Sequence, residues 1–470
     1  MKDTIVLYPA PGISHLTSMV ELGKLILRHY NSRFSLTIVI TSASFDSAKI
    51  DPYIEQVSQT NPSIAFHRFP SLPNRPSLKP PVHPVAILLE SISLNNPNLL
   101  HTLKTISETS SIAALVIDFF CNPASHVATE LSIPLYYYFP TNASIVAMFL
   151  HLPILHNETD KSFRELGNTI LHVPGLPPVR ASHMSASLLD RNNQVYDNML
   201  GLGTQLLKSK GIISNTIEAL EPEAIKVIKN QTPAIFCVGP MITEPGDQSS
   251  AADWLSWLDK QPSGSVLFLC FGSRGVFSVK QISEIAVGLE RSGQRFLWVV
   301  KDPPPIDTGV RMMSPLSTMD FDLEAVMPEG FLERTRDRGL VVKSWAPQVE
   351  VLNRESVGGF VTHCGWNSVL EAVSAGVPMV AWPLYAEQHI NKEVLVEAMR
   401  VALPMEAADE DGFVVAAEVE KRVRMLMDSD EGTKMRKLCG EMKGMALAAW
   451  AENGSSRAAF NDLAQSWNRG

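Results

Sequence analysis

The sequence of 470 residues predicts an α/β fold with two doubly wound, parallel-sheet domains that follow one another along the chain. Three observations lead to this fold class. Short apolar runs alternate with longer segments of helical period, as where residues 5–8 (IVLY) precede residues 15–29. The runs are continuously apolar, which is typical of strands covered by helices on both faces. The alternation occurs twice, once before residue 216 and again from residue 266.

The first series predicts six strands joined by helices. We expect the strands at residues 5–8, 35–40, 64–69, 113–117, 135–138 and 211–215. Helices are expected at residues 15–29, where Leu16, Met19 and Val20 mark one apolar face, and near residues 122–131.

The second series predicts five more strands. We expect them at residues 266–270, 296–300, 340–342, 360–362 and 379–381, with helices between them that include residues 279–291 and 391–400. Because Pro, Gly, Asp and Ser cluster at residues 240–251, we expect a first domain at 1–240, a linker at 241–251 and a second domain at 252–452. Residues 72–84 and 302–320 have no period and predict long surface loops.

Composition excludes several classes of protein. Hydrophobic residues make up 45 % of the chain, which is typical of a globular protein. The net charge is −9 and no basic stripe is present, so a nucleic-acid or anionic-membrane partner is disfavoured. The five cysteines are widely spaced and form no C-x-x-C, which favours a reducing compartment over disulfides or a zinc site.

The sequence contains no membrane or targeting signal that we can identify. The apolar run at residues 5–8 ends at Pro9 and is too short for the core of a signal peptide. No stretch approaches the roughly 20 apolar residues of a membrane span. We therefore expect a cytoplasmic protein.

Common nucleotide and hydrolase motifs are missing. Gly201 and Gly203 begin a G-x-G without the third glycine of a dinucleotide fingerprint, and no P-loop or G-x-S-x-G elbow occurs. The sequence therefore disfavours a dehydrogenase or a serine hydrolase.

Residues 345–388 carry the strongest functional signal. The strand at 358–362 runs into the turn His363-Cys364-Gly365-Trp366, which opens a helix whose free amides can bind a phosphate or diphosphate. His363, Asn367 and Ser368 can add side-chain donors there. Trp345 offers a flat face for a base, and three further side chains offer acceptors for ribose and sugar hydroxyls: Glu371, Glu387 and Gln388.

Each of these residues also has a purely structural interpretation. Ser368 and Glu371 match a helix capping box, and Trp345 and Trp366 could be core residues. A metal site at His363 and Cys364 is disfavoured, since no second ligand pair lies nearby in the sequence.

Taken together, this segment resembles the signature box of plant secondary-product family 1 UDP-glycosyltransferases. WAPQ, HCGWNS and the closing EQ all stand in place, without a gap. The resemblance extends over nearly the whole chain, including VLYPAPGISHLTSMVELGK at the start and FLCFGS around Gly272 and Ser273. It is closest to the branch that acts on flavonoids, chalcones and dihydrochalcones.

The resemblance implies a GT-B fold, in which two Rossmann-like domains face a cleft. Residues 1–240 would bind the acceptor and residues 252–452 the UDP-sugar. A C-terminal helix within residues 453–470 would cross back to the N-terminal domain.

The resemblance also implies roles for individual residues of the donor site. Trp345 would stack on uracil, Ala346 and Gln348 would hold the base or ribose, and Glu371 would take the ribose hydroxyls. The diphosphate would lie against Ser273, His363, Gly365, Asn367 and Ser368. The sugar would contact Thr141, Trp366, Glu387 and Gln388. Gln388 favours glucose, and a Trp rather than an Arg at position 366 disfavours glucuronic acid.

His15 and Asp118 are the expected catalytic pair. His15 follows a Pro- and Gly-rich turn after the first strand, and Asp118 ends the strand at 113–117, where doubly wound sheets bind ligands. In the family these positions hold the base and its partner. A phenol with a pKa near 10 needs a base at neutral pH, so His15 would take its proton while Asp118 fixes the tautomer. Attack opposite the departing UDP would invert the sugar and give a β-glucoside.

The acceptor itself cannot be named from the sequence. We expect Phe119, Phe120 and Met184 to line its pocket together with the loop at 72–84. Arg274, next to Ser273, could add positive charge near the phosphates or lie on the surface. Helix amides would take the place of a metal, so we expect no metal and no cofactor beyond the donor, no nucleic-acid partner and a monomer.

Three other activities stay open at the level of sequence. C-glucosylation would use the same base and donor as O-glucosylation. A nucleotide-sugar-binding protein without transfer would need neither His15 nor Asp118. A nucleotide-sugar epimerase or hydrolase on the same fold would turn over the sugar without an acceptor.

Overall fold

The computed structural model describes residues 2–41, 47–72, 83–231, 234–242, 252–304, 321–408 and 412–467. It divides into two compact units. The first comprises Met1–Thr243 and Ala449–Gly470, and the second comprises Glu244–Ala448. Most of the predicted linker at 241–251 and of the predicted loops at 72–84 and 302–320 lies outside the described residues.

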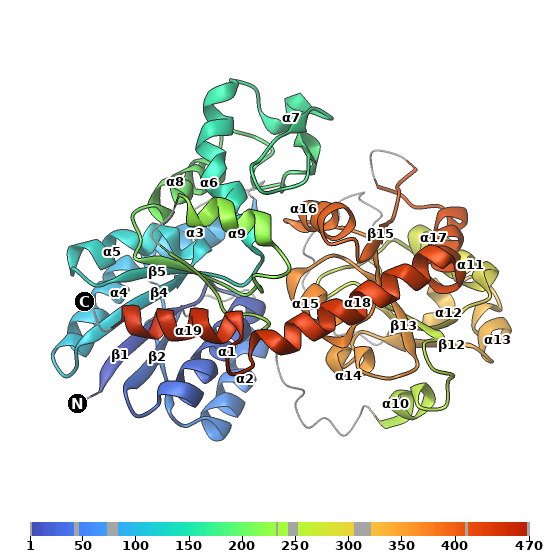
Figure 1. Cartoon of the computed structure of the whole chain (residues 1–470), viewed down its shortest axis with the longest axis horizontal. Coiled ribbons are helices and arrows are strands. Elements are labelled where there is room, and N and C mark those ends of the chain that lie inside the picture. Colours follow the sequence, from blue (N-terminus) through green and yellow to red (C-terminus); the bar gives the residue numbers. More distant parts are fainter. Residues whose placement is uncertain are drawn as a thin grey trace. The chain divides into compact units, whose positions relative to one another are not determined.

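The first unit contains a parallel sheet in the order β3-β2-β1-β4-β5-β8-β9 (Figure 1). Its strands are β1 (Asp3–Tyr8), β2 (Phe34–Ile40), β3 (Ile64–Arg68), β4 (Ile112–Asp118), β5 (Leu135–Phe139), β8 (Gly211–Ser214) and β9 (Ile235–Cys237). All six predicted strands are confirmed. The sequence analysis missed β9, which has only three residues, and a small antiparallel hairpin of β6 (Ile170–Leu171) and β7 (Val179–Arg180).

Helices follow most strands of the first unit. They are α1 (Ile13–Tyr30), α2 (Ser47–Thr60), α3 (Pro84–Leu94), α4 (Asn96–Ser107), α5 (Ser125–Glu130), α6 (Ala143–Glu158), α7 (Phe163–Leu166), α8 (Gln194–Leu206), α9 (Pro222–Lys229) and α19 (Ser455–Ser466), with short 3-10 turns η1 (Phe119–Ala124) and η2 (Ala181–His183). The helix expected near 122–131 begins as η1 and continues as α5, because Pro123 lies inside its first turn.

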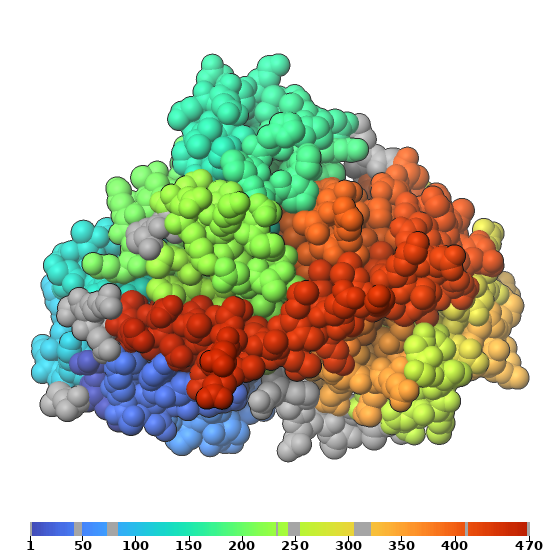
Figure 2. Space-filling model, in the orientation of Figure 1, coloured from blue at the N-terminus to red at the C-terminus, as the bar shows by residue number. Residues whose placement is uncertain are grey.

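The last helix of the chain packs into the core of the first unit. Phe460, Leu463 and Trp467 are buried in the same hydrophobic cluster as β1 and β2. The Trp467 ring meets Phe34 edge-on at 5.5 Å and Tyr136 at 6.3 Å between ring centroids. In the space-filling view the red surface of α19 lies against blue and green surface of the same unit (Figure 2). The first hydrophobic core therefore combines residues from both ends of the sequence.

The second unit contains a parallel sheet in the order β12-β11-β10-β13-β14-β15. Its strands are β10 (Val266–Cys270), β11 (Arg295–Val300), β12 (Gly339–Lys343), β13 (Val357–Thr362), β14 (Met379–Ala381) and β15 (Ala402–Pro404). The five predicted strands are confirmed, and β15, again three residues long, was missed.

The helices of the second unit lie between these strands and after them. They are α10 (Ala252–Leu258), α11 (Val279–Ser292), α12 (Leu323–Val326), α13 (Phe331–Thr335), α14 (Gln348–Leu352), α15 (Trp366–Ala375), α16 (Gln388–Glu393), α17 (Ala416–Asp428) and α18 (Asp430–Ala449). The helix expected at 391–400 is divided: α16 ends at Glu393, and a π-helical turn, η4 (Val394–Ala398), follows it.

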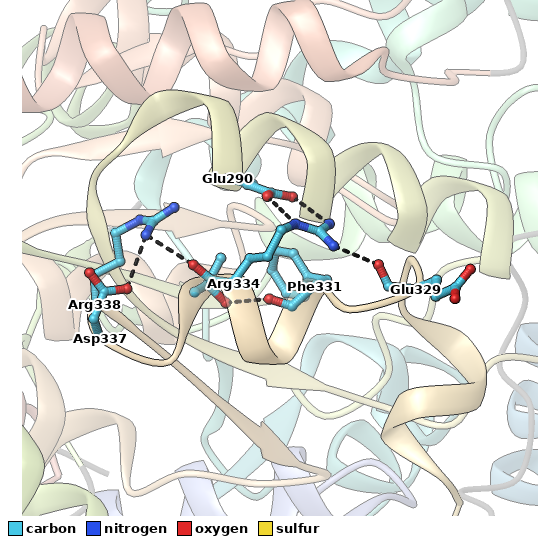
Figure 3. A network of polar contacts seen from close by, with 7 residues as sticks. Glu290, Glu329, Phe331, Arg334, Asp337 and Arg338 are labelled. Atoms are coloured by element: carbon cyan, nitrogen blue, oxygen red, sulfur yellow. Dashed lines mark hydrogen bonds and ion pairs between the residues drawn. The ribbon is translucent and has the colours of Figure 1, made fainter.

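Contacts of α13 set the path of the chain into β12. The Arg334 guanidinium donates to both carboxylate oxygens of Glu290 on α11, at 2.6 and 3.0 Å, and to the Glu329 carbonyl at 2.8 Å (Figure 3). These groups are exposed, so their contribution to stability is small. The main anchor is Phe331, which is fully buried and stacks on Phe296 at 6.0 Å. This packing places β12, and Trp345 lies two residues after its end.

Each sheet reverses its strand order at one point. In the first sheet β1 pairs with β2 on one side and with β4 on the other. In the second sheet β10 stands in the same way between β11 and β13. Such a switch point leaves a crevice at the carboxyl ends of the two central strands, where doubly wound proteins bind ligands. The fold therefore marks two places: the ends of β1 and β4, and the ends of β10 and β13.

Two further observations concern compartment and chemistry. All five cysteines are buried free thiols. Within the described ranges, no helix is both long enough and apolar enough to cross a membrane.

Candidate functional site

His15 and Asp118 meet at the switch point of the first sheet. His15 is the third residue of α1, which follows β1, and Asp118 is the last residue of β4. His15 Nδ1 lies 2.8 Å from Asp118 Oδ2, and the other carboxylate oxygen accepts a hydrogen bond from the Phe120 amide at 3.0 Å. Asp118 is fully buried, whereas 23 % of the His15 side chain is exposed. The carboxylate therefore orients the imidazole, with Nδ1–H donating to Asp118 and the lone pair on Nε2.

Aromatic rings surround this pair. Phe120 meets the His15 ring edge-on at 5.5 Å, and Phe119 lies 6.4 Å from it. Phe119 stacks on Phe139 at 4.9 Å and also contacts Phe149. The predicted acceptor residues Phe119 and Phe120 are thus brought to His15. Met184, the third predicted residue, is buried just after η2, and none of the described contacts joins it to His15.

Thr141 lies after β5, at the start of α6, and it is held by groups that the sequence analysis missed. Its carbonyl accepts a hydrogen bond from the Ser214 hydroxyl at 2.8 Å. The buried Glu221 carboxylate accepts from the amides of Ala143 and Ser144, both at 2.9 Å, at the N-terminus of α6. The Thr141 hydroxyl is buried and has no hydrogen-bond partner among the described residues. A polar ligand atom could supply the missing partner.

In the second unit, the turn after β13 leads into the N-terminus of α15. His363 follows β13, Cys364 has a positive φ of 65°, and Gly365 is the N-cap residue with no side-chain cap. The first amides of a helix have no acceptor within the helix, so this terminus favours an anion. Asn367, which is exposed, and Ser368, which is buried, both lie in the first turn of α15. The arrangement suits a phosphate or diphosphate.

His363 is a neutral imidazole in this structure. Burial, with a smaller contribution from the positive charge of Lys301, lowers the pKa of His363 to about 3. Its ring lies against two glycines: a Cβ placed on Gly272 would be 2.4 Å from Nε2, and one on Gly365 would be 2.5 Å away. Nδ1 is buried and has no partner in the part of the chain that the structure describes. His363 can therefore offer one N–H to a ligand but no positive charge.

Lys301 supplies a charge that the sequence analysis missed. It follows β11 directly, and its ammonium group donates a hydrogen bond to the Gly272 carbonyl, in the turn after β10. Ser273, the next residue, is exposed. Arg274 is half-buried, and its charge acts on Tyr385, where it partly opposes the effect of burial, which raises the pKa of Tyr385 to about 12. Arg274 thus lies near the loop before α16.

A second group of predicted residues meets where α14 and α15 adjoin. The Gln348 amide donates to the Ser368 hydroxyl at 2.8 Å and to the Glu371 carboxylate at 2.6 Å. Burial raises the pKa of Glu371 to about 7, although the Gln348 hydrogen bond opposes this rise. Ser368 and Glu371 do not form the capping box, because Gly365 is the N-cap. Ala346, two positions before Gln348 in the sequence, is also buried.

The Trp345 side chain presents an aromatic face to solvent. Half of the residue is exposed, which is unusual for so large an apolar side chain. Trp254 on α10, which the sequence analysis did not single out, meets it edge-on at 6.4 Å and an interplanar angle of 78°. The free face of Trp345 can stack on a planar ring.

The remaining predicted sugar residues lie at the starts of α15 and α16. Trp366 is only 2 % exposed, so its ring belongs to the core. The Gln388 side-chain oxygen accepts from the amides of Leu384 and Tyr385, at 2.9 and 3.0 Å, which directs its NH₂ group elsewhere. Glu387 is the half-buried N-cap residue of α16.

The described residues contain no group of three or more His, Cys, Asp or Glu that could hold a metal ion. What they do contain is an imidazole hydrogen-bonded to a buried carboxylate, an uncapped helix N-terminus, a half-exposed indole ring and a second buried carboxylate.

Comparison with known proteins agrees with this chemistry. The family model "UDP-glucoronosyl and UDP-glucosyl transferase" matches residues 253–418. The chain is 51 % identical to UDP-glycosyltransferase 88F3 of Pyrus communis, covering 97 % of this chain and 98 % of the relative. It is 49 % identical to a phloretin 2'-O-glucosyltransferase of Malus domestica, with the same coverage.

Solved structures show the same fold. Phytolacca americana UGT2, complexed with UDP-2fluoro-glucose and pterostilbene, superimposes with a TM-score of 0.88 at 35 % identity, covering 99 % of this chain and 100 % of that one.

Proposed function

This chain belongs to the family of UDP-glucuronosyl and UDP-glucosyl transferases and is a glycosyltransferase; we propose that it transfers glucose from UDP-glucose to a phenolic acceptor of the flavonoid or chalcone type, with inversion. Relatives of this chain are named for glucosylation of phloretin, and one solved neighbour binds pterostilbene, which supports a phenolic acceptor. The observation that carries the mechanism is the hydrogen bond of 2.8 Å between His15 and Asp118 at the first switch point.

His15 acts as the general base in this proposal. A phenol has a pKa near 10, so it must lose its proton as it attacks at neutral pH. Nε2 of His15 takes the proton, and the buried Asp118 carboxylate stabilises the imidazolium that forms. The edge-on Phe120 ring favours a planar aromatic acceptor beside His15. The activated nucleophile is the acceptor, so no covalent enzyme intermediate forms.

The second unit holds the donor. Trp345 stacks on uracil, and Glu371, held by Gln348, accepts from the ribose hydroxyls. The diphosphate binds the N-terminus of α15 with Asn367, Ser368, His363 and the Ser273 turn, which stabilises the charge of departing UDP. In the second unit the glucose hydroxyls bind Glu387 and the NH₂ group of Gln388, and Trp366 contributes its backbone at the first helical position. In the first unit, we assign a sugar contact to the buried Thr141 hydroxyl, as the family resemblance implies.

A mass assay with an active-site variant tests the proposal. Purified protein is incubated with UDP-glucose and a panel of flavonoids, dihydrochalcones and simple phenols. We expect a mass gain of one hexose, and we expect His15→Ala to lower the rate by ~10²–10⁴-fold. His101→Ala, at an exposed position on α4, is the matched control and should keep full activity.

Other outcomes identify the competing activities. A product that resists acid hydrolysis indicates C-glucosylation. Release of glucose or a new sugar nucleotide without an acceptor indicates a hydrolase or epimerase. Binding of UDP-glucose with no product on any acceptor, and no effect of His15→Ala, overturns the proposed transfer in favour of a binding protein.

No metal takes part in the proposed step, because helix amides and polar side chains hold the diphosphate. We expect activity to persist after treatment with a chelator, as measured by product formation. A loss that Mg²⁺ restores would contradict this part of the proposal. A monomer and a cytoplasmic location are also proposed; light scattering of the purified protein and imaging of a tagged chain test them.

A further inference from the structure

The turn that precedes α15 contains a strained residue. Cys364 has a φ of 65°, a left-handed conformation that glycine adopts readily and other residues rarely. For an L-residue this conformation is unfavourable, because the Cβ comes too close to a backbone carbonyl oxygen. Cys364 is fully buried, and its amide donates a long hydrogen bond, 3.3 Å, to the Thr362 hydroxyl. The conformation therefore needs support from outside the turn.

Asn391 supplies that support. This residue of α16 is fully buried, and its side-chain NH₂ group donates to the Cys364 carbonyl oxygen at 2.9 Å. The two residues are 27 positions apart in the sequence. Loss of this donor would leave a buried carbonyl without the bond, which is costly.

The peptide plane transmits this contact to the next residue. A trans peptide is planar, so the Cys364 carbonyl and the Gly365 N–H point in opposite directions along one rigid unit. When Asn391 fixes the carbonyl, it also fixes the direction of the Gly365 N–H, away from α16. Gly365 is the N-cap of α15, whose first amides form the anion site.

Asn391 also connects this turn to the sugar residues. The backbone N–H of Asn391 donates to the Glu387 carbonyl at 3.0 Å, in the first turn of α16, which begins at Gln388. A shift of α16 would therefore move the Cys364 carbonyl, Glu387 and Gln388 together.

We infer that Asn391 is a positioning residue for donor binding: it holds the Cys364–Gly365 peptide plane so that the Gly365 N–H points at the donor diphosphate. Asn391 acts through the turn and not by touching the donor. This inference rests on the proposed function, since it takes the N-terminus of α15 as the diphosphate site.

Calorimetric titration with UDP alone tests the inference. Asn391→Asp keeps the shape of the side chain but removes the donor at neutral pH, and Asn391→Ala removes both. We expect UDP affinity to fall about tenfold or more in each variant. In turnover, KM for UDP-glucose should rise while KM for the phenol stays unchanged. Leu395→Ala, at a fully buried site in η4, should lower thermal stability but leave UDP affinity unchanged.

Rescue at position 364 separates positioning from general damage. Glycine adopts a φ of 65° without strain, so Cys364→Gly should restore several-fold UDP affinity to Asn391→Ala. Cys364→Ala removes the same sulfur but keeps the Cβ, and it should not. Equal effects of the glycine and alanine variants, or unchanged UDP affinity in Asn391→Asp, would overturn the inference alone. A wild-type protein that binds no UDP would overturn the proposed function together with it.

Discussion

At the residue scale, burial shifts the pKa values of two groups of the proposed donor site in opposite directions. It lowers the pKa of His363 to about 3 and raises the pKa of Glu371 to about 7, since a low-dielectric site disfavours the charged form of each. His363 is therefore neutral at every working pH. Glu371 changes its charge close to neutral pH, and ligand binding can shift its pKa.

We predict that UDP affinity depends on the protonation of Glu371. Ribose hydroxyls donate hydrogen bonds, so they bind the ionised carboxylate better, and binding releases a proton near pH 7. Affinity should be constant above pH 7 and fall by up to about tenfold per pH unit below it. Calorimetry between pH 5.5 and 8.5, in buffers of different ionisation enthalpy, measures both effects. A Glu371→Gln variant should show weak affinity and no proton release, and an equally steep pH dependence in that variant would refute the assignment.

The same shift predicts a change in stability. Because the pKa of Glu371 is raised in the folded state, the folded protein binds this proton more tightly than the unfolded chain does. The contribution of Glu371 to stability therefore decreases as pH rises from about 4.5 to 7 and is constant above that. Glu371→Gln should raise the melting temperature of the ligand-free protein at pH 8 but not at pH 4. A lower melting temperature at pH 8 would contradict the raised pKa.

At the element scale, the turn after β10 limits the room around His363. Gly272 has a φ of 70°, and its missing side chain is the space in which the His363 ring lies. Lys301 ties the same turn to the end of β11 through the Gly272 carbonyl. Residues just after the ends of three strands, β10, β11 and β13, thus meet at the proposed anion site.

We predict that Gly272→Ala weakens UDP binding by about tenfold or more, because the new Cβ would displace the His363 ring. Gly293→Ala is the matched control: Gly293 has a φ of 71° at the end of α11, but a Cβ there meets no atom within 4 Å. Because both glycines have a positive φ, each substitution should lower stability by a similar amount, on the order of 1 kcal/mol. UDP titration and thermal unfolding of the pair separate strain from the clash. Equal UDP affinity in both variants would contradict the predicted clash.

At the scale of the whole molecule, the chain begins and ends in the same unit. Residues after 448 complete a core that β1 starts, so this unit cannot finish folding until the C-terminus is available. The second unit is continuous in sequence and carries most of the proposed donor residues.

We predict that Trp467→Ala destabilises the first unit by about 3–5 kcal/mol, the usual cost of removing a large buried aromatic side chain. Leu447→Ala, at a residue that is 69 % exposed, is the control and should change stability little. Guanidinium unfolding with and without UDP measures the effect. UDP should raise the denaturant midpoint of the second unit by mass action. Trp467→Ala should lower the midpoint of the other transition, that of the first unit. An unchanged transition would show that α19 is not an integral part of the first core.

Most of the strands and the family could be predicted from the local sequence. Continuous apolar runs were enough to predict the strands of both sheets, because a strand covered on both faces needs apolar residues at every position. The short strands β9 and β15 were missed, since three residues carry too little pattern to separate them from a loop. The motif at 345–388 was enough to indicate the family, and the donor residues that it implies stay a prediction.

Only the tertiary structure decided which of those side chains meet and what holds them. Asn391 and Cys364, Glu221 and Ser144, and Lys301 and Gly272 are contacts between segments far apart in the chain. No period or spacing reports such pairs, because they depend on how whole elements pack. Burial is set in the same way: it makes His363 neutral, brings the pKa of Glu371 to about 7 and places the Trp366 ring in the core. The sequence therefore determined the chemistry that is present, and the packing decided its charge and direction.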